Sequence, residues 1–475
     1  MSEFQRSGHG LTVFLSFRID KNIPTSGYPS IEDRFVSESE QLLGFPPGST
    51  AGILRRTMKP TAHSFTVNGR TYTPPAQPVA VLCLDGSADA YLDAAMARGL
   101  MPHAQRLAVQ GWRGSARAAM PTFTNVNNSS IVTGVPPSVH GIGGNFFYDT
   151  SIGQEVMMNS SSFLRVPTLF PAAQSAGRKV AVVTAKEKLR DIFASGLISK
   201  GGIAFSSEKA RDAALASHGI EGVEALSGPT PAIYSGDASL YVLRAGVQLL
   251  QAGRADFLYL STTDFMQHKY VPDAPEALAF YASIDAEIGQ LLLLGAVVGI
   301  TADHGMNSKQ RADGTPNVVY LESELNARWG EGFRVILPIT DPYVVHHGAL
   351  GSFAQVHLPT DRSVSLAEVL DFVATLPGIT EVLPRDQAAR RMELPADRMG
   401  DLVVCSGRDA VIGRTPAYHD LKAIEGGLRS HGGRYEELVP FILSHPLRPE
   451  YAARALGDPR NFDIFDFTCN GTTAL

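Results

Sequence analysis

The fold is decided by an apolar run that ends on a carboxylate, Val-Ala-Val-Leu-Cys-Leu-Asp-Gly at residues 79–86. The same pattern returns twice further along the chain. Residues 257–263 lead into Asp264, and residues 297–302 lead into Asp303. Continuous apolar runs separated by helical stretches are typical of a parallel sheet that is covered by helices on both faces. The sequence therefore predicts an α/β fold in which three strands end on aspartate.

Further strands and helices of the same sheet can be placed from the pattern. Short apolar runs at residues 180–183 and 439–443 are predicted as strands, and the stretches at 94–110 and 277–293 are predicted as helices. Alternation of this kind indicates helices between parallel strands.

The pattern also divides the chain. Residues 63–308 and 424–475 carry the alternating strands and helices, and we expect them to form one catalytic core. Residues 309–423 mix short strands with a helix and are expected to be an α+β cap inserted into that core. Residues 1–62 are rich in Ser, Gly and Pro without a sustained period. We expect them to be an extension outside the main fold, either disordered or not native, with Met58 as an alternative start.

Composition narrows the class of protein. Hydrophobic residues make up 44% of the chain and charged residues 19%, as in a globular enzyme. The formal net charge of −6 argues against a protein that binds nucleic acid through a basic surface. No run of 18 apolar residues suggests a membrane span. The three cysteines, Cys83, Cys405 and Cys469, are far apart and form no C-x-x-C pair, so we expect a reducing compartment, the cytoplasm.

The three strand-end aspartates predict a metal site. Ligands of open α/β sheets bind outside the carboxyl ends of the strands, and carboxylates gathered there repel one another unless cations balance them. Three histidines are placed to join them: His268, four residues after Asp264, His304, next to Asp303, and His431, before the last core strand. A single aspartate at a strand end is usually a turn former or helix cap, but three together favour metal. Mixed carboxylate and imidazole donors suit zinc, with manganese or iron as alternatives.

Residues 120–134 form a segment crowded with hydroxyl and amide side chains that becomes helix-like. A hydroxyl at a helix N-terminus lies in a positive field that favours an attacking alkoxide and an incoming phosphoryl group. Spacing alone does not choose between Thr122 and Thr124 as nucleophile. The alternative is a capping loop without catalytic function.

These motifs, in this order, resemble the nucleotide pyrophosphatase/phosphodiesterase branch of the alkaline phosphatase superfamily. The motifs are Leu84-Asp85-Gly86, Pro121 to Thr124 with Asn127, Thr133-Gly134, His140 to Asn145, Asp264 with His268, Asp303 to Met306, and His431-Gly432. Within that branch the chain is most similar to the phosphonoacetate hydrolase family. The stretches that carry this closer resemblance are residues 67–70, residues 397–404 and the pair Lys186 and Lys188.

The resemblance implies an alkaline-phosphatase-like three-layer sandwich with a mainly parallel sheet, and a site with two divalent metal ions. One ion would be held by Asp264, His268 and His431, and the other by Asp85, Asp303 and His304. Thr124 would be the nucleophile beside the second ion, Asn127 would donate to a phosphoryl oxygen, and His140 would be structural. His346 and His347 receive no role.

The expected reaction is hydrolysis of phosphonoacetate to acetate and phosphate through a phosphothreonine. The leaving group is a carbanion whose charge spreads into the neighbouring carboxylate, where cations are required. Lys186 and Lys188, two residues apart at a strand end, can face the same side and supply them, although a solvated charge cluster is the alternative.

Two other functions remain open. The first is a phosphodiesterase or nucleotide pyrophosphatase in which Phe146, Phe147 and Tyr148 stack on a base. The second, a metal-dependent binding protein without catalysis, is disfavoured because Thr124 and all six ligands are present. The expected partner is a small phosphonate, without nucleic acid or membrane, and a homodimer is left open.

Overall fold

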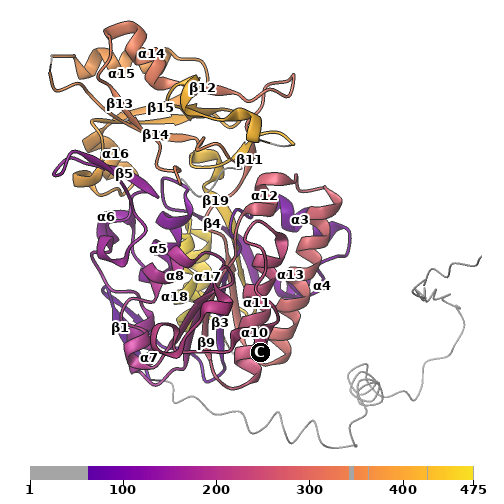
Figure 1. Ribbon diagram of the computed structural model, residues 1–475. Helices are drawn as coiled ribbons and strands as arrows, with labels where there is room; N and C mark the ends of the chain where they lie inside the picture. The colour runs from indigo at the N-terminus through magenta and orange to yellow at the C-terminus, as the bar shows by residue number, and fades with distance from the viewer. Residues whose placement is uncertain (1–62, 342–346, 362, 425, 474–475) are drawn as a thin grey trace, which may run out of the picture. The chain divides into compact units, whose positions relative to one another are not determined.

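The computed structural model describes residues 63–341, 347–361, 363–424 and 426–473. Its centre is a seven-stranded sheet (Figure 1). In spatial order the strands are β4 (Trp112–Arg117), β19 (Leu438–Leu443), β10 (Val297–Thr301), β3 (Val79–Cys83), β9 (Phe257–Ser261), β7 (Val180–Thr184) and β8 (Ile203–Ser206). The pairs from β10 to β8 are parallel, whereas β19 pairs antiparallel with both β10 and β4. The sheet is therefore mainly parallel, as the sequence predicts.

The register of the three central strands brings their carboxyl ends level. Cys83 at the end of β3 pairs with Ser261 on β9 and with Thr301 on β10. Each strand then runs on for a few residues to its aspartate. Because parallel strands end at one edge of a sheet, the three carboxylates meet there.

The two faces of the sheet have separate cores. Ala80 and Leu82 of β3 pack into one core, and Val79, Val81 and Cys83 pack into the other. This alternation is what the period of two in a strand requires. On either face, each large apolar side chain that is buried stabilises the sheet by about 1.5–3 kcal/mol.

Helices cover both faces and complete three layers (Figure 1). One face is covered by α3 (Asp89–Ala97), α4 (Pro102–Gln110), α11 (Gly236–Gln251) and α13 (Pro275–Leu293). The other face is covered by α5 (Thr124–Thr133), α7 (Phe170–Ser175), α8 (Glu187–Phe193) and α18 (Ile464–Asp466).

The helix predicted at 94–110 is wrong as a single element, because α3 and α4 are two helices. Gly99 adopts a left-handed φ of 70°, and Pro102 then starts α4. A residue before proline disfavours the helical region, and glycine ends helices at low steric cost, so the chain turns between them.

A second, four-stranded antiparallel sheet lies within the range predicted for the cap. Its strands, in order, are β13 (Arg334–Ile336), β14 (Phe353–His357), β16 (Leu402–Ser406) and β15 (Ile379–Pro384). It packs with α14 (Leu321–Trp329), α15 (Leu366–Thr375) and α16 (Arg385–Arg391) around its own apolar core. That core also takes in Met120, Phe123 and Val126, which flank Thr124. The nucleophile segment is thus held by this core and, through Ile131 and Val132, by the core on one face of the central sheet.

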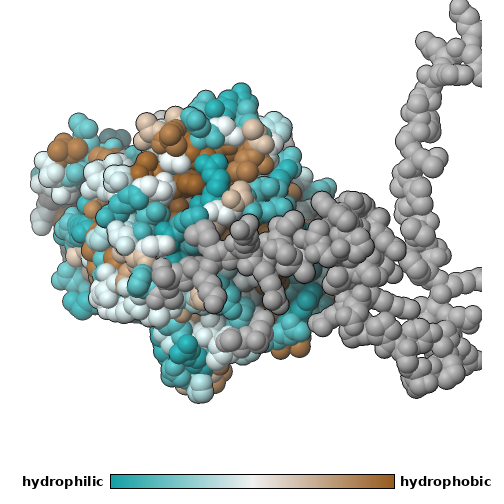
Figure 2. All heavy atoms as spheres, turned by 90° about the horizontal axis from the view of Figure 1, so that it is seen from below, coloured by the Kyte–Doolittle hydropathy of each residue, from teal (hydrophilic) through white to brown (hydrophobic). Residues whose placement is uncertain are grey.

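Apolar and polar residues are interspersed on the face shown in Figure 2. Among the described residues, no helix has both the length and the hydropathy needed to cross a membrane. The prediction for residues 1–62 falls outside the described part of the chain.

Candidate active site

Asp85, Asp303 and His304 form one buried cluster at the carboxyl edge of the sheet. Their side chains are fully buried, and His304 Nε2 lies 3.3 Å from Asp85 Oδ1 and 3.7 Å from Asp303 Oδ2. One ligand atom from each residue lies within 4.8 Å of the others. Neither carboxylate oxygen of Asp85 has a hydrogen-bond partner among the described residues. Buried oxygens without a donor are expensive unless a cation meets them, so this cluster fits a metal ion.

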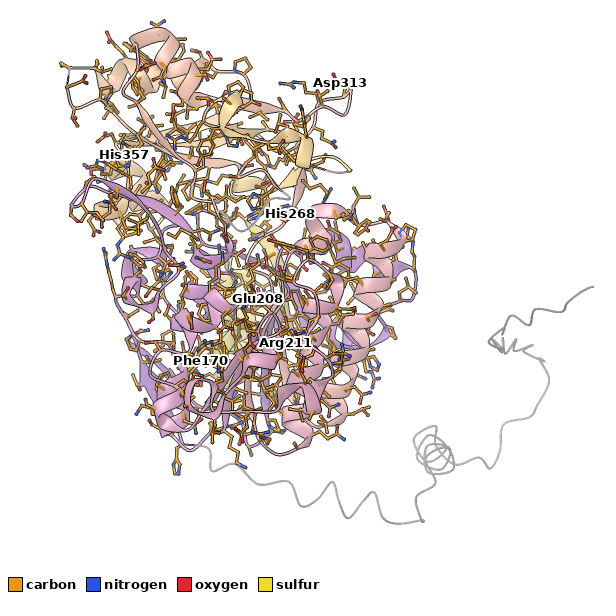
Figure 3. The ribbon with its side chains drawn as sticks, viewed as in Figure 1. Phe170, Glu208, Arg211, His268, Asp313 and His357 are labelled. Atoms are coloured by element: carbon orange, nitrogen blue, oxygen red, sulfur yellow. The ribbon has the colours of Figure 1, made fainter. Side chains whose placement is uncertain are left out.

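Asp264, His268 and His431 form the second cluster. Asp264 is the N-cap residue of the short helix α12 (Phe265–Lys269), so His268 lies one turn after it on the same face, as the i, i+4 spacing predicts. His268 Nε2 lies 2.9 Å from Asp264 Oδ2, and His431 Nε2 lies 3.6 Å from the same oxygen. These donors also lie within 4.8 Å of one another. Figure 3 shows His268 between the central sheet and the antiparallel sheet.

The two clusters are neighbours. The rings of His304 and His431 stack with centroids 3.5 Å apart and an interplanar angle of 7°. Two ions held by these clusters would act on one substrate, which is the arrangement of two-metal hydrolases.

Each imidazole is oriented by a backbone carbonyl. The Nδ1 atoms contact the carbonyl oxygens of Arg429, Gly305 and Thr122, for His268, His304 and His431 respectively, at 2.7–2.9 Å. A proton on Nδ1 leaves the Nε2 lone pair directed at the carboxylate cluster, as metal-binding histidines require. The six predicted ligands thus form two compact groups of carboxylate and imidazole donors, each of which could hold a divalent metal ion.

The electrostatics of the clusters also call for positive charge. Burial, and then the charges of Asp264 and Asp303, raise the pKa of Asp85 well above its usual range. Burial alone would lower the pKa of His304, but the Asp303 and Asp85 carboxylates outweigh it and raise that pKa to about 10. Both raised pKa values mean that the cluster favours an added positive charge, either a proton or a cation.

The structure separates the two candidate nucleophiles. Thr122 is fully buried, donates to Gly433 O at 3.0 Å and accepts from Gly432 N at 3.0 Å, so its hydroxyl is used to hold the His431 loop. Thr124 is the first residue of α5, and its Oγ1 lies 3.3 Å from His304 Nε2. Thr124 also lines the pocket beside the clusters. Thr124 thus has the position of a nucleophile.

Asn127 does not lie where the sequence placed it. Its Oδ1 accepts from Ala119 N at 2.6 Å and from Asn461 at 3.0 Å, and its Nδ2 donates to Ala119 O at 2.9 Å. The side chain braces the backbone before the nucleophile and does not line the pocket. Asn145 lines the pocket instead, next to Thr124. Asn127 lies three residues after Thr124 on α5, and its side chain points away from the pocket. Sequence order alone does not show this.

Asn128 joins the nucleophile helix to the metal cluster. Its Nδ2 donates to Asp303 Oδ2 and to Thr124 O, both at 3.1 Å. Its Oδ1 accepts from the hydroxyls of Tyr259 at 2.6 Å and Ser261 at 2.7 Å on β9. The sequence analysis missed this residue, because its partners come from three separate strands and helices.

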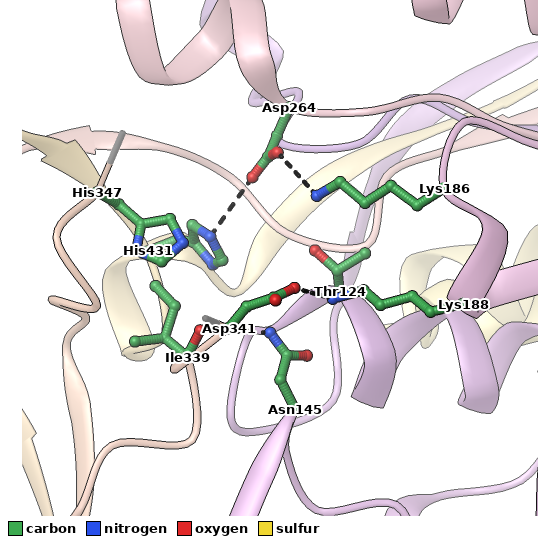
Figure 4. A pocket seen from close by; sticks show the side chains of 9 residues that line it. All are labelled: Thr124, Asn145, Lys186, Lys188, Asp264, Ile339, Asp341, His347 and His431. Atoms are coloured by element: carbon green, nitrogen blue, oxygen red, sulfur yellow. Dashed lines mark hydrogen bonds and ion pairs between the residues drawn. The ribbon is translucent and has the colours of Figure 1, made fainter. Parts of the chain in front are cut away.

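Both predicted lysines face the pocket, but not from a strand. β7 ends at Thr184, Lys186 is the extended N-cap of α8, and Lys188 lies in its first turn. Lys186 Nζ lies 3.8 Å from Asp264 Oδ1, and Lys188 Nζ pairs with Asp341 (Figure 4). Burial would lower the pKa of Lys186, but Asp264 and Asp85 raise it, so its ammonium is held charged.

Other residues of the pocket wall were not predicted. They are Asn145, Ile339, Asp341 and His347. His347 received no role from sequence, yet its ring lies 5.4 Å from that of His268, while His346 lies outside the described residues. The signal in the sequence was weak: only Asn145, within the Gly-Gly-Asn motif, could have been found.

His140 has the structural position that the resemblance implies. Its Nδ1 accepts from Ile142 N at 3.1 Å, so its Nε2 carries the proton toward Ser130 Oγ at 2.8 Å. An imidazole protonated on that nitrogen cannot act as a base toward the serine. Burial, aided by the Arg398 charge, lowers the pKa of His140 to about 3.

The fold is a mainly parallel sheet between two layers of helices, and two adjoining carboxylate–histidine clusters lie at its edge beside a threonine. Together they define a metal-dependent hydrolase of the alkaline phosphatase type. Comparison with known proteins agrees. The family model for type I phosphodiesterase / nucleotide pyrophosphatase matches residues 79–433. Phosphonoacetate hydrolase from Sinorhizobium meliloti 1021, solved with phosphonoformate, is 48% identical over 87% of this chain and 100% of that one, with a TM-score of 0.82. Its structure with phosphonoacetate matches at 47% identity with the same coverage and TM-score.

A murine ectonucleotide pyrophosphatase / phosphodiesterase 5 shares the fold alone, at 18% identity over 84% of this chain and 96% of that one, with a TM-score of 0.55. The chain belongs to the type I phosphodiesterase / nucleotide pyrophosphatase family and, within it, to the phosphonoacetate hydrolases.

Proposed function

We propose that this protein hydrolyses the carbon–phosphorus bond of phosphonoacetate, giving acetate and phosphate through a phosphothreonine at Thr124. The observation that carries the proposal is a small pocket with the Thr124 hydroxyl and the Lys186 and Lys188 ammonium groups on its wall (Figure 4). A phosphonate beside the threonine would place its carboxylate within reach of the lysines. The relative solved with phosphonoacetate supports the same substrate.

The residues of the chain divide the work of the reaction. The Thr124 hydroxyl loses its proton to solvent and its oxygen attacks phosphorus, while the electron pair of the broken P–C bond moves onto the carbon and into the carboxylate. Lys186 and Lys188 stabilise that enediolate, which then takes a proton from solvent to become acetate. Asn145 donates to a phosphonate oxygen. Water then hydrolyses the phosphothreonine and restores Thr124.

Two divalent metal ions, which we propose to be zinc, would be held by the two clusters. They would supply charge to the phosphonate oxygens and lower the pKa of the threonine hydroxyl. The donors are Asp264, His268 and His431 for one ion, and Asp85, Asp303 and His304 for the other.

The geometry disfavours nucleotide hydrolysis. None of the three aromatic residues considered for base stacking lines the pocket. Phe147 packs in a small apolar cluster against Phe163, and Tyr148 lies under Arg334, with the guanidinium carbon 4.3 Å from the ring centre. A base would find no stacking wall there. We further propose a cytoplasmic location, which the three buried free cysteines support.

The test is to incubate the zinc-loaded protein with phosphonoacetate and measure phosphate and acetate together, with a nitrophenyl phosphodiester in parallel. The proposal expects equal amounts of the two products. Thr124→Ser, which keeps a hydroxyl, should retain part of the activity that Thr124→Ala loses. Diester cleavage without any acetate would make the protein a phosphodiesterase.

A further inference from the structure

A carboxylate of the protein itself contacts Lys188, one of the two lysines that we propose to bind the substrate. Asp341 Oδ2 forms an ion pair with Lys188 Nζ, and the Asp341 side chain is only 4% exposed. Figure 4 shows the two side chains pointing toward one another beside Asn145 and Thr124. Asp341 follows β13 and comes from the side of the antiparallel sheet, whereas Lys188 belongs to α8 of the central sheet.

The pocket that this pair lines is small, with a volume of about 20 Å³. A substrate carboxylate that enters the pocket to reach Lys188 approaches Asp341 as well.

Each lysine of the wall lies close to a carboxylate of the protein. Lys186 lies 3.8 Å from Asp264, and Lys188 is in direct contact with Asp341. A substrate carboxylate that approaches Lys188 meets the like charge of Asp341. Two carboxylates close to one ammonium in a buried site repel each other, so each weakens the binding of the other.

We propose that Asp341 is a specificity-determining counter-ion, which holds Lys188 in the free enzyme and is displaced by the carboxylate of the substrate. The idea rests on the proposed function and defines its substrate class more narrowly. A phosphonate that carries a carboxylate one carbon from phosphorus displaces Asp341, whereas a phosphonate or phosphate ester without a carboxylate leaves the pair closed. After the carbon–phosphorus bond breaks, Asp341 returns to Lys188 and displaces acetate.

Asp341→Asn tests this directly, because the amide keeps the size and can still accept from Lys188 while the competing charge is lost. The KM for phosphonoacetate and the inhibition constant of acetate should both fall by about tenfold, since a like charge close to a bound anion weakens its binding. A matched control is Glu208→Gln. Glu208 accepts from the first helical N–H of α8, at Glu187, and does not line the pocket. This control should leave both constants unchanged, and melting temperatures should show that both variants fold.

Two results would overturn the proposal. A higher KM and weaker acetate inhibition in Asp341→Asn would mean that Asp341 orients Lys188 for the substrate. Unchanged constants would mean that the pair does not compete with substrate. If Asp341→Asn does not fold, Asp341→Glu keeps the charge and should keep acetate a weak inhibitor; tight inhibition by acetate would contradict the account.

Failure of the proposed function can be distinguished from failure of the inference about Asp341. If the unaltered protein releases no acetate from phosphonoacetate, the function is wrong. Acetate inhibition of nitrophenyl diester hydrolysis, compared between the unaltered protein and Asp341→Asn, then still measures whether Asp341 competes for Lys188.

Discussion

The metal clusters and the pocket wall that faces them are built in different ways. The three aspartates follow the ends of adjacent parallel strands, where the register fixes their distance, and carbonyls of the chain orient each imidazole. The wall is assembled from a loop before β5 (Phe146–Asp149) and a segment after β13, which lie outside the central sheet, and from the start of α8, which follows β7 of that sheet. The comparison teaches that the clusters supply chemistry common to many phosphoryl substrates, whereas the wall selects among them.

The largest effect is expected at the nucleophile. Thr124→Ala removes the oxygen that would attack phosphorus, and kcat should fall at least about a thousandfold on phosphonoacetate and on a diester alike. Steady-state kinetics on both substrates checks this. A Thr124→Ala variant that loses only one of the two activities would show that the two reactions do not share a nucleophile.

A smaller effect is expected at Asn128, which supports the clusters without lining the pocket. Asn128→Ala removes the donor to Asp303 Oδ2, so metal affinity and kcat should each fall about 10–100-fold, with KM little changed. Metal titration followed by kinetics measures both. Tyr259→Phe, which removes one of the two hydroxyls that hold Asn128, should have a weaker effect. Unaltered metal affinity in Asn128→Ala would reject its positioning role.

Two asparagines distinguish the wall from the scaffold. Asn145→Ala should lower kcat/KM about tenfold with no change in melting temperature, since it removes one hydrogen bond to the substrate. Asn127→Ala leaves the buried N–H and C=O of Ala119 without their partner, and should destabilise the fold by about 1–3 kcal/mol. Thermal unfolding and kinetics of both variants check the contrast. The opposite assignment of the two effects would restore the role that the sequence gave to Asn127.

A further prediction concerns acid stability. The pKa of His140 is lowered to about 3 in the folded chain, so the unfolded chain binds the proton at a higher pH. The stability linked to this group is therefore complete above about pH 6.5, the usual histidine pKa, and is lost as pH falls toward 3. In His140→Gln the melting temperature should fall less steeply between pH 6 and pH 4. Equal slopes in both proteins would contradict this.

The sequence predicted five of the seven strands of the central sheet and the strand-end aspartates, because both depend on local pattern, whereas β4 and β8 were missed. Each strand is a short apolar run, and each aspartate follows its strand directly. The break between α3 and α4 was missed although Gly99 and Pro102 mark it, because the apolar period continues across it.

The substrate wall could not be predicted to the same degree. Asp341 and Ile339 come from a segment far along the chain from Thr124, and no periodicity connects them. Asn127 and Asn128 are neighbours in sequence, but one braces a turn and the other a metal ligand. This difference depends on the direction in which each side chain projects from α5. The packing of the nucleophile segment against the apolar cores fixes that direction.

The most direct test of this division is the specificity ratio of the double variant Lys186→Ala/Lys188→Ala. We expect kcat/KM for phosphonoacetate to fall about a hundredfold or more, because two buried cations that meet the carboxylate are lost, while kcat/KM for a nitrophenyl diester changes by less than about threefold. Metal content should stay the same. Equal losses on both substrates would contradict the account, since the lysines would then serve the chemistry of the clusters and not the choice of substrate.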